Sequence, residues 1–269
     1  MKEEKQMPRV SIVVTTYNWP RALELSVRSI FRQSVLPCDI LVADDGSGEE
    51  TRELVDRLRE ESPVPLVHVW HEDKGFRLSV IRNKAIARAS GDYIIQIDGD
   101  VILPRHFVSD HLDLAEQGHF VCGSRVKLPE KATERILSGD ISSLRIWDVS
   151  MGFVIKSLRS RALRHFLAFR YAKTIDHLRG CNMAFWRSDA IKVNGYNEDL
   201  LQWGHEDGEF AFRLHFAGVA KKALKMGGCV YHLNHKIASR DNEQRHLDEL
   251  EAVKRERRKW CENGIDKYL

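Results

Sequence analysis

Residues 93–100 read Tyr-Ile-Ile-Gln-Ile-Asp-Gly-Asp, a mostly aliphatic run that ends in two carboxylates. A short aliphatic run of this kind is typical of a strand that is buried on both faces. Comparable runs occur upstream at 10–15, 40–43 and 66–70. Segments with helical periodicity lie between these runs at 20–31, 49–61 and 75–89. Strands that alternate with helices through short connections predict an α/β fold with a mainly parallel, Rossmann-like sheet flanked by helices.

Polar side chains follow these predicted strands at the points where the strands end. The carboxyl ends of parallel strands meet at one edge of a sheet, and ligands of such folds bind there. Tyr17, Asp44, Asp45, Asp98 and Asp100 all come just after a predicted strand. We therefore expect a single polar rim that holds the functional site.

The regular alternation stops beyond about residue 126. Residues 127–180 are expected to form a helical insert, and the chain ends in a charge-rich, helix-prone tail. Neither an internal repeat nor a linker rich in Gly, Ser or Pro divides the chain. The sequence thus predicts one compact domain with a first half at 1–125, a second half at 126–239 and a helical tail at 240–269.

The composition of the 269 residues, with 43% hydrophobic and 30% charged residues, is that of an ordinary globular protein. The formal net charge of +3 is too close to balance to indicate nucleic-acid binding. The sequence has no apolar run of the ~20 residues that a membrane span needs, and its first residues lack the apolar core of a signal peptide. Five scattered cysteines without a Cys-x-x-Cys pair indicate reduced thiols. We expect a cytoplasmic protein.

Asp98-Gly99-Asp100 is the sharpest local motif. Two carboxylates separated by one glycine can offer oxygen atoms to a hard divalent cation, and such a cation can neutralise a diphosphate leaving group. An acidic turn after a strand is the alternative, because short motifs of this kind recur by chance. His232 or His235 could add an imidazole ligand to such a site.

Two further acidic pairs lie before predicted helices. Asp45 can accept hydrogen bonds from a base or a ribose, and Tyr17 offers a ring on which a base can stack. The pair Glu206 and Asp207 can supply a carboxylate that takes a proton from a hydroxyl nucleophile, with Trp203 nearby as a surface for a sugar. Helix capping and stabilisation of the helix dipole explain the same acidic residues without any function.

The order of these motifs resembles that of the family 2 glycosyltransferases with the GT-A fold, over about residues 8–235. The chain carries T-T-Y-N, D-D-G-S, K-G-F-R-x-x-x-x-R-N, D-G-D, G-C-N-M-A-F, W-G-x-E-D and Y-H-x-x-H in that order. Residues 180–214 look especially like the C-terminal motif region of the β-1,4-galactosyltransferases and of bacterial chondroitin-polymerase-type domains.

This resemblance implies an inverting, metal-dependent hexosyltransferase. Such an enzyme moves a hexose or N-acetylhexosamine from a nucleotide sugar, with UDP as the favoured nucleotide, to a hydroxyl of a glycan or lipid-linked glycan. Polysaccharide or lipopolysaccharide biosynthesis is the implied setting. The donor sugar, the acceptor and the linkage position stay open.

The resemblance also implies roles for individual residues. Contacts to the nucleotide are implied for Thr15, Tyr17, Asp45, Arg77, Arg82 and Asp98. Contacts to the donor sugar are implied for Gly180, Cys181, Asn182, Trp203, Gly204 and Glu206. Asp100 and His232 match ligands of Mn²⁺ or Mg²⁺, and Asp207 matches the catalytic base. His205 stands where the galactosyltransferase pattern has glycine, a change that narrows the acceptor site.

Residues 151–173 form a basic and amphipathic segment that is relevant to the kind of acceptor. Six Lys or Arg residues and no acidic residue lie between Lys156 and Lys173. An apolar stripe at helical spacing is formed by Ile155, Leu158, Ala162, Phe166 and Phe169. A basic amphipathic helix lies at anionic membrane surfaces, which implies peripheral contact with the inner face of the membrane and a membrane-linked acceptor. A helix packed over the active site, with its Lys and Arg in solvent, is the alternative.

Other functional classes stay open beside the transferase. A haloacid-dehalogenase-like phosphohydrolase also carries Asp-x-Asp at a strand end, but normally on its first strand, whereas three predicted strands precede Asp98 here. A non-catalytic sugar-nucleotide-binding module would keep the same rim. A pyrophosphorylase is disfavoured because Thr15-Thr16-Tyr17 stands in place of its Gly-rich loop. The sequence contains neither G-x-G-x-x-G nor a P-loop, which excludes typical dehydrogenases and kinases.

Overall fold

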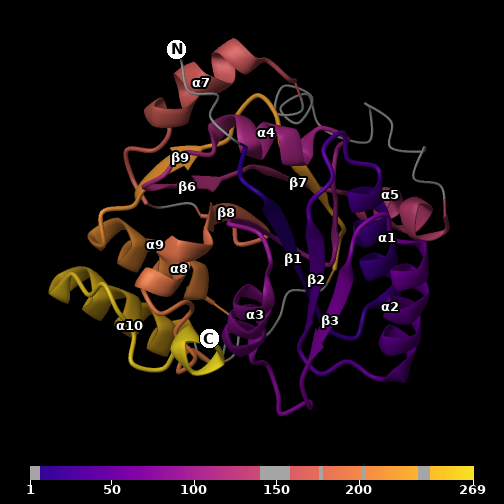
Figure 1. Ribbon diagram of the computed structural model, residues 1–269, viewed down its shortest axis with the longest axis horizontal. Coiled ribbons are helices and arrows are strands. Elements are labelled where there is room, and N and C mark those ends of the chain that lie inside the picture. Colours follow the sequence, from indigo (N-terminus) through magenta and orange to yellow (C-terminus); the bar gives the residue numbers. More distant parts are fainter. Residues whose placement is uncertain (1–6, 140–157, 176–177, 202–203, 236–242) are drawn as a thin grey trace.

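The computed structural model describes residues 7–139, 158–175, 178–201, 204–235 and 243–269 (Figure 1). In this part of the chain, the larger sheet has the order β3-β2-β1-β4-β8-β6-β9 and a smaller sheet has the order β5-β10-β7. The larger sheet consists of β1 (Val10–Thr16), β2 (Asp39–Asp44), β3 (Leu66–Trp70), β4 (Tyr93–Asp98), β6 (His119–Cys122), β8 (Asn182–Trp186) and β9 (Ala220–Ala223). The smaller sheet consists of β5 (Val101–Ile102), β7 (Arg125–Lys127) and β10 (Val230–His232).

The mainly parallel α/β sheet that the sequence predicts is confirmed. β1 pairs in parallel with β2 and β4, and β2 pairs in parallel with β3. The exception in the larger sheet is β8, which runs antiparallel between β4 and β6. The carboxyl ends of β1, β2 and β4 therefore share one edge, where the site is expected.

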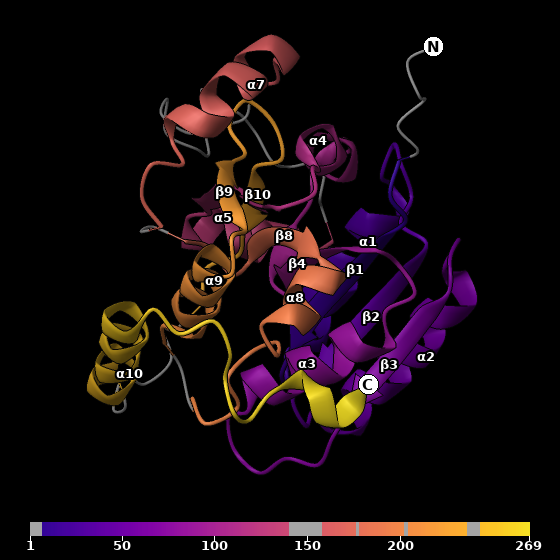
Figure 2. The same ribbon diagram turned by 60° about the vertical axis from the view of Figure 1, so that its left-hand side comes forward.

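Helices cover both faces of this sheet (Figure 2). The described helices are α1 (Pro20–Phe31), α2 (Glu49–Glu61), α3 (Leu78–Arg88), α4 (Phe107–Leu114), α5 (Glu130–Leu137), α7 (Arg161–Arg170), α8 (Arg187–Lys192), α9 (Glu206–Phe216), α10 (Glu243–Glu256) and the 3₁₀ helix η3 (Ile265–Tyr268). Because side chains alternate along a strand, Ile12 and Val14 of β1 pack with α1 and α2, whereas Val13 packs with α3, α8 and α9. None of the described helices is long and apolar enough to span a membrane.

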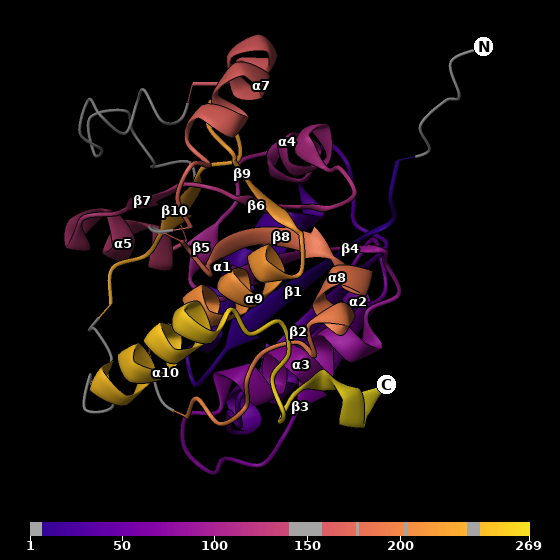
Figure 3. The same ribbon diagram turned by 90° about the vertical axis from the view of Figure 1, so that its left-hand side faces the viewer.

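One predicted boundary and the description of the C-terminal tail need correction. The helix predicted from residue 75 begins at Leu78, because Gly75 has a φ of 80°, in the left-handed region. The C-terminal tail is more than a solvated helix, since α10 lies alongside α9 and buries Leu250 and Val253 (Figure 3). The predicted divisions near residues 125 and 239 stay predictions.

Candidate active site

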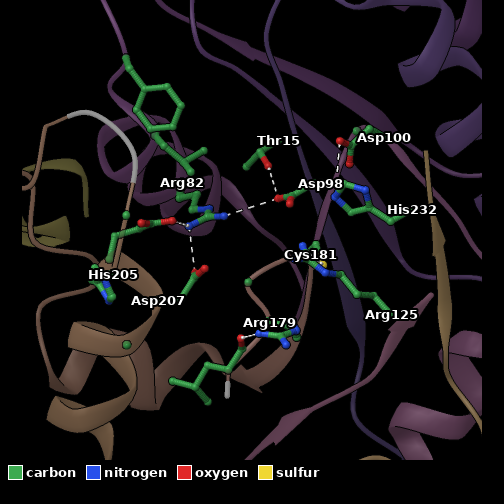
Figure 4. A pocket seen from close by; sticks show the side chains of 18 of the residues that line it. Thr15, Arg82, Asp98, Asp100, Arg125, Arg179, Cys181, His205, Asp207 and His232 are labelled. Carbon is green, nitrogen blue, oxygen red and sulfur yellow. Dashed lines mark hydrogen bonds and ion pairs between the residues drawn. The ribbon is translucent and has the colours of Figure 1, made fainter. Parts of the chain in front are cut away.

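A cleft of about 850 Å³ opens at the carboxyl edge of β1 and β4 (Figure 4). Tyr17, Asp45, Asp98 and Asp100 line it, as the predicted rim requires. Asp44 does not line the cleft: it is fully buried, and its carboxylate accepts from the Ser47 backbone N–H and pairs with His68. The opposite wall comes from the residues before β8, from the start of α9 and from α10.

Arg82 of α3 joins the acidic groups of the cleft. Its side chain is 2% exposed, and its Nη1 lies 3.0 Å from Asp207 Oδ1 and 3.2 Å from Glu206 Oε1. Its Nη2 lies 3.5 Å from Asp98 Oδ1, which also accepts a hydrogen bond of 3.0 Å from Thr15. These carboxylates engage the guanidinium group of Arg82, which also lines the cleft, and its predicted contact with the nucleotide stays a prediction.

Glu206 and Asp207 form the first turn of α9. Gly204 and His205 precede them with φ values of 126° and 61°, so the backbone turns sharply into the helix. Acidic side chains are favoured in this turn by the positive end of the helix dipole. Burial, together with the neighbouring charge of Asp207, raises the pKa of Glu206 to about 7. A left-handed conformation at His205 also explains why the galactosyltransferase pattern has glycine at this position.

Asp207 is held at one oxygen. Besides Arg82, the Tyr196 hydroxyl lies 3.3 Å and the Gln96 Nε2 lies 3.5 Å from Asp207 Oδ1. A Cβ at Gly180 would stand 1.8 Å from Asp207 Oδ2, so only glycine leaves room for this carboxylate. Gln96 and Tyr196 were not predicted from the sequence; a polar residue inside the aliphatic run 93–97 was the available signal at Gln96.

Asp100, His232 and His235 form a second cluster. Asp100 and His232 lie on the far side of Asp98 from Arg82 (Figure 4). The Nε2 atoms of His232 and His235 lie 3.6 and 3.1 Å from Asp100 Oδ2. Antiparallel pairing of β10 with β5 brings His232 opposite Val101, next to Asp100. Contact between the His232 Nδ1 and the Leu233 carbonyl, at 2.8 Å, leaves Nε2 directed at the carboxylate.

These three side chains fit a divalent cation. The ligand atoms that they offer lie within 4.8 Å of one another. Within the part of the chain that the structure describes, the buried Asp100 Oδ1 has no hydrogen-bond donor, and a bound cation would satisfy this oxygen by coordination. A carboxylate with two imidazoles suits Mn²⁺ better than Ca²⁺, which prefers oxygen ligands alone. Our sequence analysis treated His232 and His235 as alternatives, whereas the structure brings both to Asp100.

The part of the cleft that Tyr17 and Asp45 line is built by the ends of β1 and β2 and by the segment after β3. Tyr17 is half exposed, and its hydroxyl donates to Asp73 Oδ2 at 3.0 Å. Asp45 is buried; its Oδ1 contacts the His71 ring at 2.6 Å and its Oδ2 accepts from the Arg77 backbone N–H at 2.8 Å. The Arg77 guanidinium donates to the Glu72 carbonyl, and Arg77 is not among the residues that line the cleft.

The predicted sugar contacts separate into two groups. Gly180, Cys181, Gly204 and Glu206 line the cleft. Burial raises the pKa of the Cys181 thiol, so it stays protonated near neutral pH.

Asn182 does not line the cleft. Its amide is fully buried: Nδ2 donates to the Ser124 and Gly228 carbonyls at 2.8 Å each, and Oδ1 contacts His111 at 2.9 Å. A direct sugar contact is therefore replaced by a structural role that joins β8 to its neighbours. Trp203 lies outside the described residues.

Comparisons with known proteins place these motifs in a family. The sequence model described as Glycosyl transferase family 2 matches residues 11–193, and that described as N-terminal domain of galactosyltransferase matches residues 161–236. The chain is 28% identical to chondroitin synthase of Pasteurella multocida (strain Pm70), covering 83% of this chain and 24% of that protein. It is 28% identical to validoxylamine A glucosyltransferase of Streptomyces hygroscopicus subsp. limoneus, covering 79% of this chain and 49% of that protein. The chain thus spans a quarter to a half of the length of these relatives.

Solved structures support the same assignment at the level of the fold. S. aureus TarS superposes with a TM-score of 0.61 at 14% identity, covering 91% of this chain and 39% of that one. Mannosyltransferase PcManGT from Pyrobaculum calidifontis, solved in complex with GDP-Man and Mn²⁺, gives a TM-score of 0.62 at 21% identity, covering 94% and 65%. The GT-A fold is confirmed. Because the family 2 model matches more than half of its residues, the chain belongs to glycosyl transferase family 2.

Proposed function

We propose that the protein is an inverting, metal-dependent glycosyltransferase that uses a nucleotide sugar, with UDP as its nucleotide. The observation that carries this proposal is one cleft that unites a held carboxylate, Asp207, with a cation-binding cluster around Asp100. Polymer synthases and a glucosyltransferase among the relatives support a hexose or N-acetylhexosamine as the donor sugar and a glycan or glycolipid as the acceptor.

Asp207 acts as the general base in this proposal. Its carboxylate takes the proton of the acceptor hydroxyl while the hydroxyl oxygen attacks the anomeric carbon from the face opposite the nucleotide. A bond forms between this oxygen and the anomeric carbon, and the bond from that carbon to the diphosphate oxygen breaks. A single displacement inverts the configuration, so an α-linked donor gives a β-glycoside. Glu206 holds sugar hydroxyls beside the reacting carbon.

Asp100, His232 and His235 would hold Mn²⁺ or Mg²⁺. When bound, the ion supplies positive charge that stabilises the departing diphosphate. Arg125 and Lys127 of β7 also line the cleft, and Lys127 pairs with His232 in the β7–β10 ladder. We assign the charge at the diphosphate to these two side chains rather than to Arg77 or Arg82, because Arg77 lies outside the cleft lining and Arg82 is held by carboxylates.

The base and ribose contacts are proposed at Tyr17 and Asp45. Tyr17 presents a half-exposed ring at the edge of the cleft, suited to stacking. Asp45 is positioned by His71, and Thr15 positions Asp98. With the nucleotide at these residues, the acceptor binds against the wall of the cleft that α9 and α10 form.

A membrane-linked acceptor is supported by α7. Leu163, Phe166 and Phe169 are 46%, 65% and 57% exposed, whereas Arg164 is 2% exposed and pairs with Asp110 and Asp113. The helix thus directs aliphatic and aromatic side chains outward and a cation inward. Arg164 does not fit the alternative in which the cations of this helix lie in solvent, whereas the Arg161 side chain is 81% exposed, as that alternative predicts. Ile155 lies outside the described residues.

A binding and product assay tests the proposal. Thermal unfolding is followed with UDP, GDP and dTDP, each with and without Mn²⁺, for the wild type and for Asp100→Ala. We expect an Mn²⁺-dependent stabilisation by UDP, roughly 2.7 kcal/mol at a hundredfold excess over Kd, that Asp100→Ala removes. The anomeric configuration of the product is then read by NMR.

Three outcomes would contradict parts of this proposal. Stabilisation by GDP or dTDP alone changes the nucleotide. Retained α configuration rejects inversion and the role of Asp207. Nucleotide binding without transfer to any glycan, or phosphate release without transfer, favours the binding-module or phosphohydrolase alternative.

A further inference from the structure

The two oxygens of Asp207 differ in their surroundings. Oδ1 faces donors from three separate parts of the chain: Arg82 of α3 at 3.0 Å, Tyr196 at 3.3 Å and Gln96 of β4 at 3.5 Å. Among the described residues, Oδ2 accepts no hydrogen bond from the protein, and it lies where Gly180 has no side chain. One oxygen is therefore anchored and the other is open to a ligand.

The anchoring groups are themselves fixed. Gln96 is fully buried; its Nε2 also donates to the Gly180 carbonyl at 3.1 Å, and its Oε1 accepts from the Tyr196 hydroxyl at 2.9 Å. This amide orientation is the one that directs N–H, and not C=O, toward Asp207. The single hydroxyl hydrogen of Tyr196 is shared between Gln96 and Asp207.

Tyr196 is fixed through both its ring and its backbone. Its ring stacks on Phe210 of α9 with centroids 4.4 Å apart, and the Arg82 guanidinium lies over the ring at 5.1 Å. Asn83, the residue after Arg82, bonds both the N–H and the C=O of Tyr196 at 2.8 Å. Adjacent residues of α3 therefore hold Asp207 and the tyrosine beside it.

We propose that Arg82, Gln96 and Tyr196 are positioning residues that hold Asp207 by Oδ1, so that Oδ2 alone takes the proton of the acceptor. This inference rests on the proposed role of Asp207 as the general base. A carboxylate fixed in this way approaches the acceptor hydroxyl in one orientation, and reaction rates fall steeply when such a group is displaced by about 1 Å. None of the three residues needs to touch the acceptor.

Tyr196→Phe is the test, since it removes the hydroxyl and keeps the ring. Tyr93→Phe is the matched control: Tyr93 is equally buried, and its hydroxyl has no hydrogen-bond partner among the described residues. We expect Tyr196→Phe to lower kcat by at least about 10-fold, the effect of one hydrogen bond to a charged group, with the KM for the donor unchanged. The pH profile of kcat is recorded for each variant beside these constants.

Two further variants keep the outcomes distinct. Gln96→Asn retracts the amide from Asp207 and should give the same pattern, so the test survives if Tyr196→Phe folds poorly. Asp207→Asn tests the base itself. This inference alone is overturned if the positioning variants and Tyr93→Phe have equal kcat and pH profiles while Asp207→Asn loses transfer. The proposed function is overturned if Asp207→Asn retains transfer.

Discussion

Glu206 is a buried carboxyl group beside a second carboxylate, and its ionisation opposes folding. Its pKa of about 7 lies above the ordinary value of 4.5. Between these two pH values the folded protein keeps a proton that the unfolded chain has lost. The stability that this proton confers is complete below pH 4.5 and is lost as the pH rises to 7, a decrease of roughly 3 kcal/mol in the free energy of unfolding.

Glu206→Gln should remove this pH dependence. We expect the variant to match the wild type near pH 4 and to exceed its free energy of unfolding at pH 8, as measured by urea denaturation. Glu53→Gln, at an exposed position of α2, is the control and should change neither value. A variant that is less stable than the wild type at pH 8 would show that the glutamate is ionised and favourably paired.

Gly180→Ala should abolish transfer without unfolding the protein. The new Cβ would stand 1.8 Å from Asp207 Oδ2, so the carboxylate must move. We expect a loss of about 100-fold or more in kcat, measured beside the melting temperature. Gly48→Ala is the control, because a Cβ there meets nothing within 4 Å. Normal kcat in Gly180→Ala would mean that this carboxylate does no chemistry.

His232→Ala and His235→Ala should each weaken Mn²⁺ binding by at least about 10-fold, since each removes one ligand. His232 should have the larger effect, because the Leu233 carbonyl already orients its ring. Titration of free Mn²⁺ by electron paramagnetic resonance measures both, with His119→Ala as a distant control. If the affinity for Mn²⁺ is unchanged in both variants, the cation does not bind at His232 and His235.

At the scale of single elements, α7 exposes Leu163, Phe166 and Phe169 on its outer side. Leu163→Glu combined with Phe166→Glu should abolish flotation with anionic liposomes, because both side chains are exposed and their replacements repel the lipid. Val67→Glu, on the exposed face of β3, should float as the wild type does. The proposed membrane contact is wrong if the wild-type protein stays at the bottom of the gradient at low salt.

The elements of the first hundred residues are predictable because their signals are local. The ranges predicted for α2 and β3 match the structure, β1 and β4 extend one residue further at the carboxyl end, and β2 extends one residue further at each end. β8 is different: G-C-N-M-A-F gives a motif but no orientation. Its antiparallel place between β4 and β6 depends on pairing over long sequence distances, which periodicity does not encode.

At the scale of the whole molecule, the order of motifs predicts which residues line the cleft better than it predicts which side chains contact one another there. Asp98, Asp100, Glu206, Asp207 and His232 all line one cleft, as expected. Partners between motifs were missed, because side-chain networks such as those around Asp207 form only when distant elements pack. The same packing explains why Asn182 was misassigned and His71 was overlooked.

The cleft lies across the boundary between two sequence signatures. The family 2 match ends at residue 193, so it contains Asp98 and Asp100 but neither the Glu206–Asp207 pair nor the histidines of β10 and its end. Those come from the stretch matched by the galactosyltransferase model. A protein matched by the first signature alone therefore need not carry counterparts of Glu206, Asp207, His232 and His235. Inventories of such enzymes should be sorted by the second signature before any chemistry is assigned.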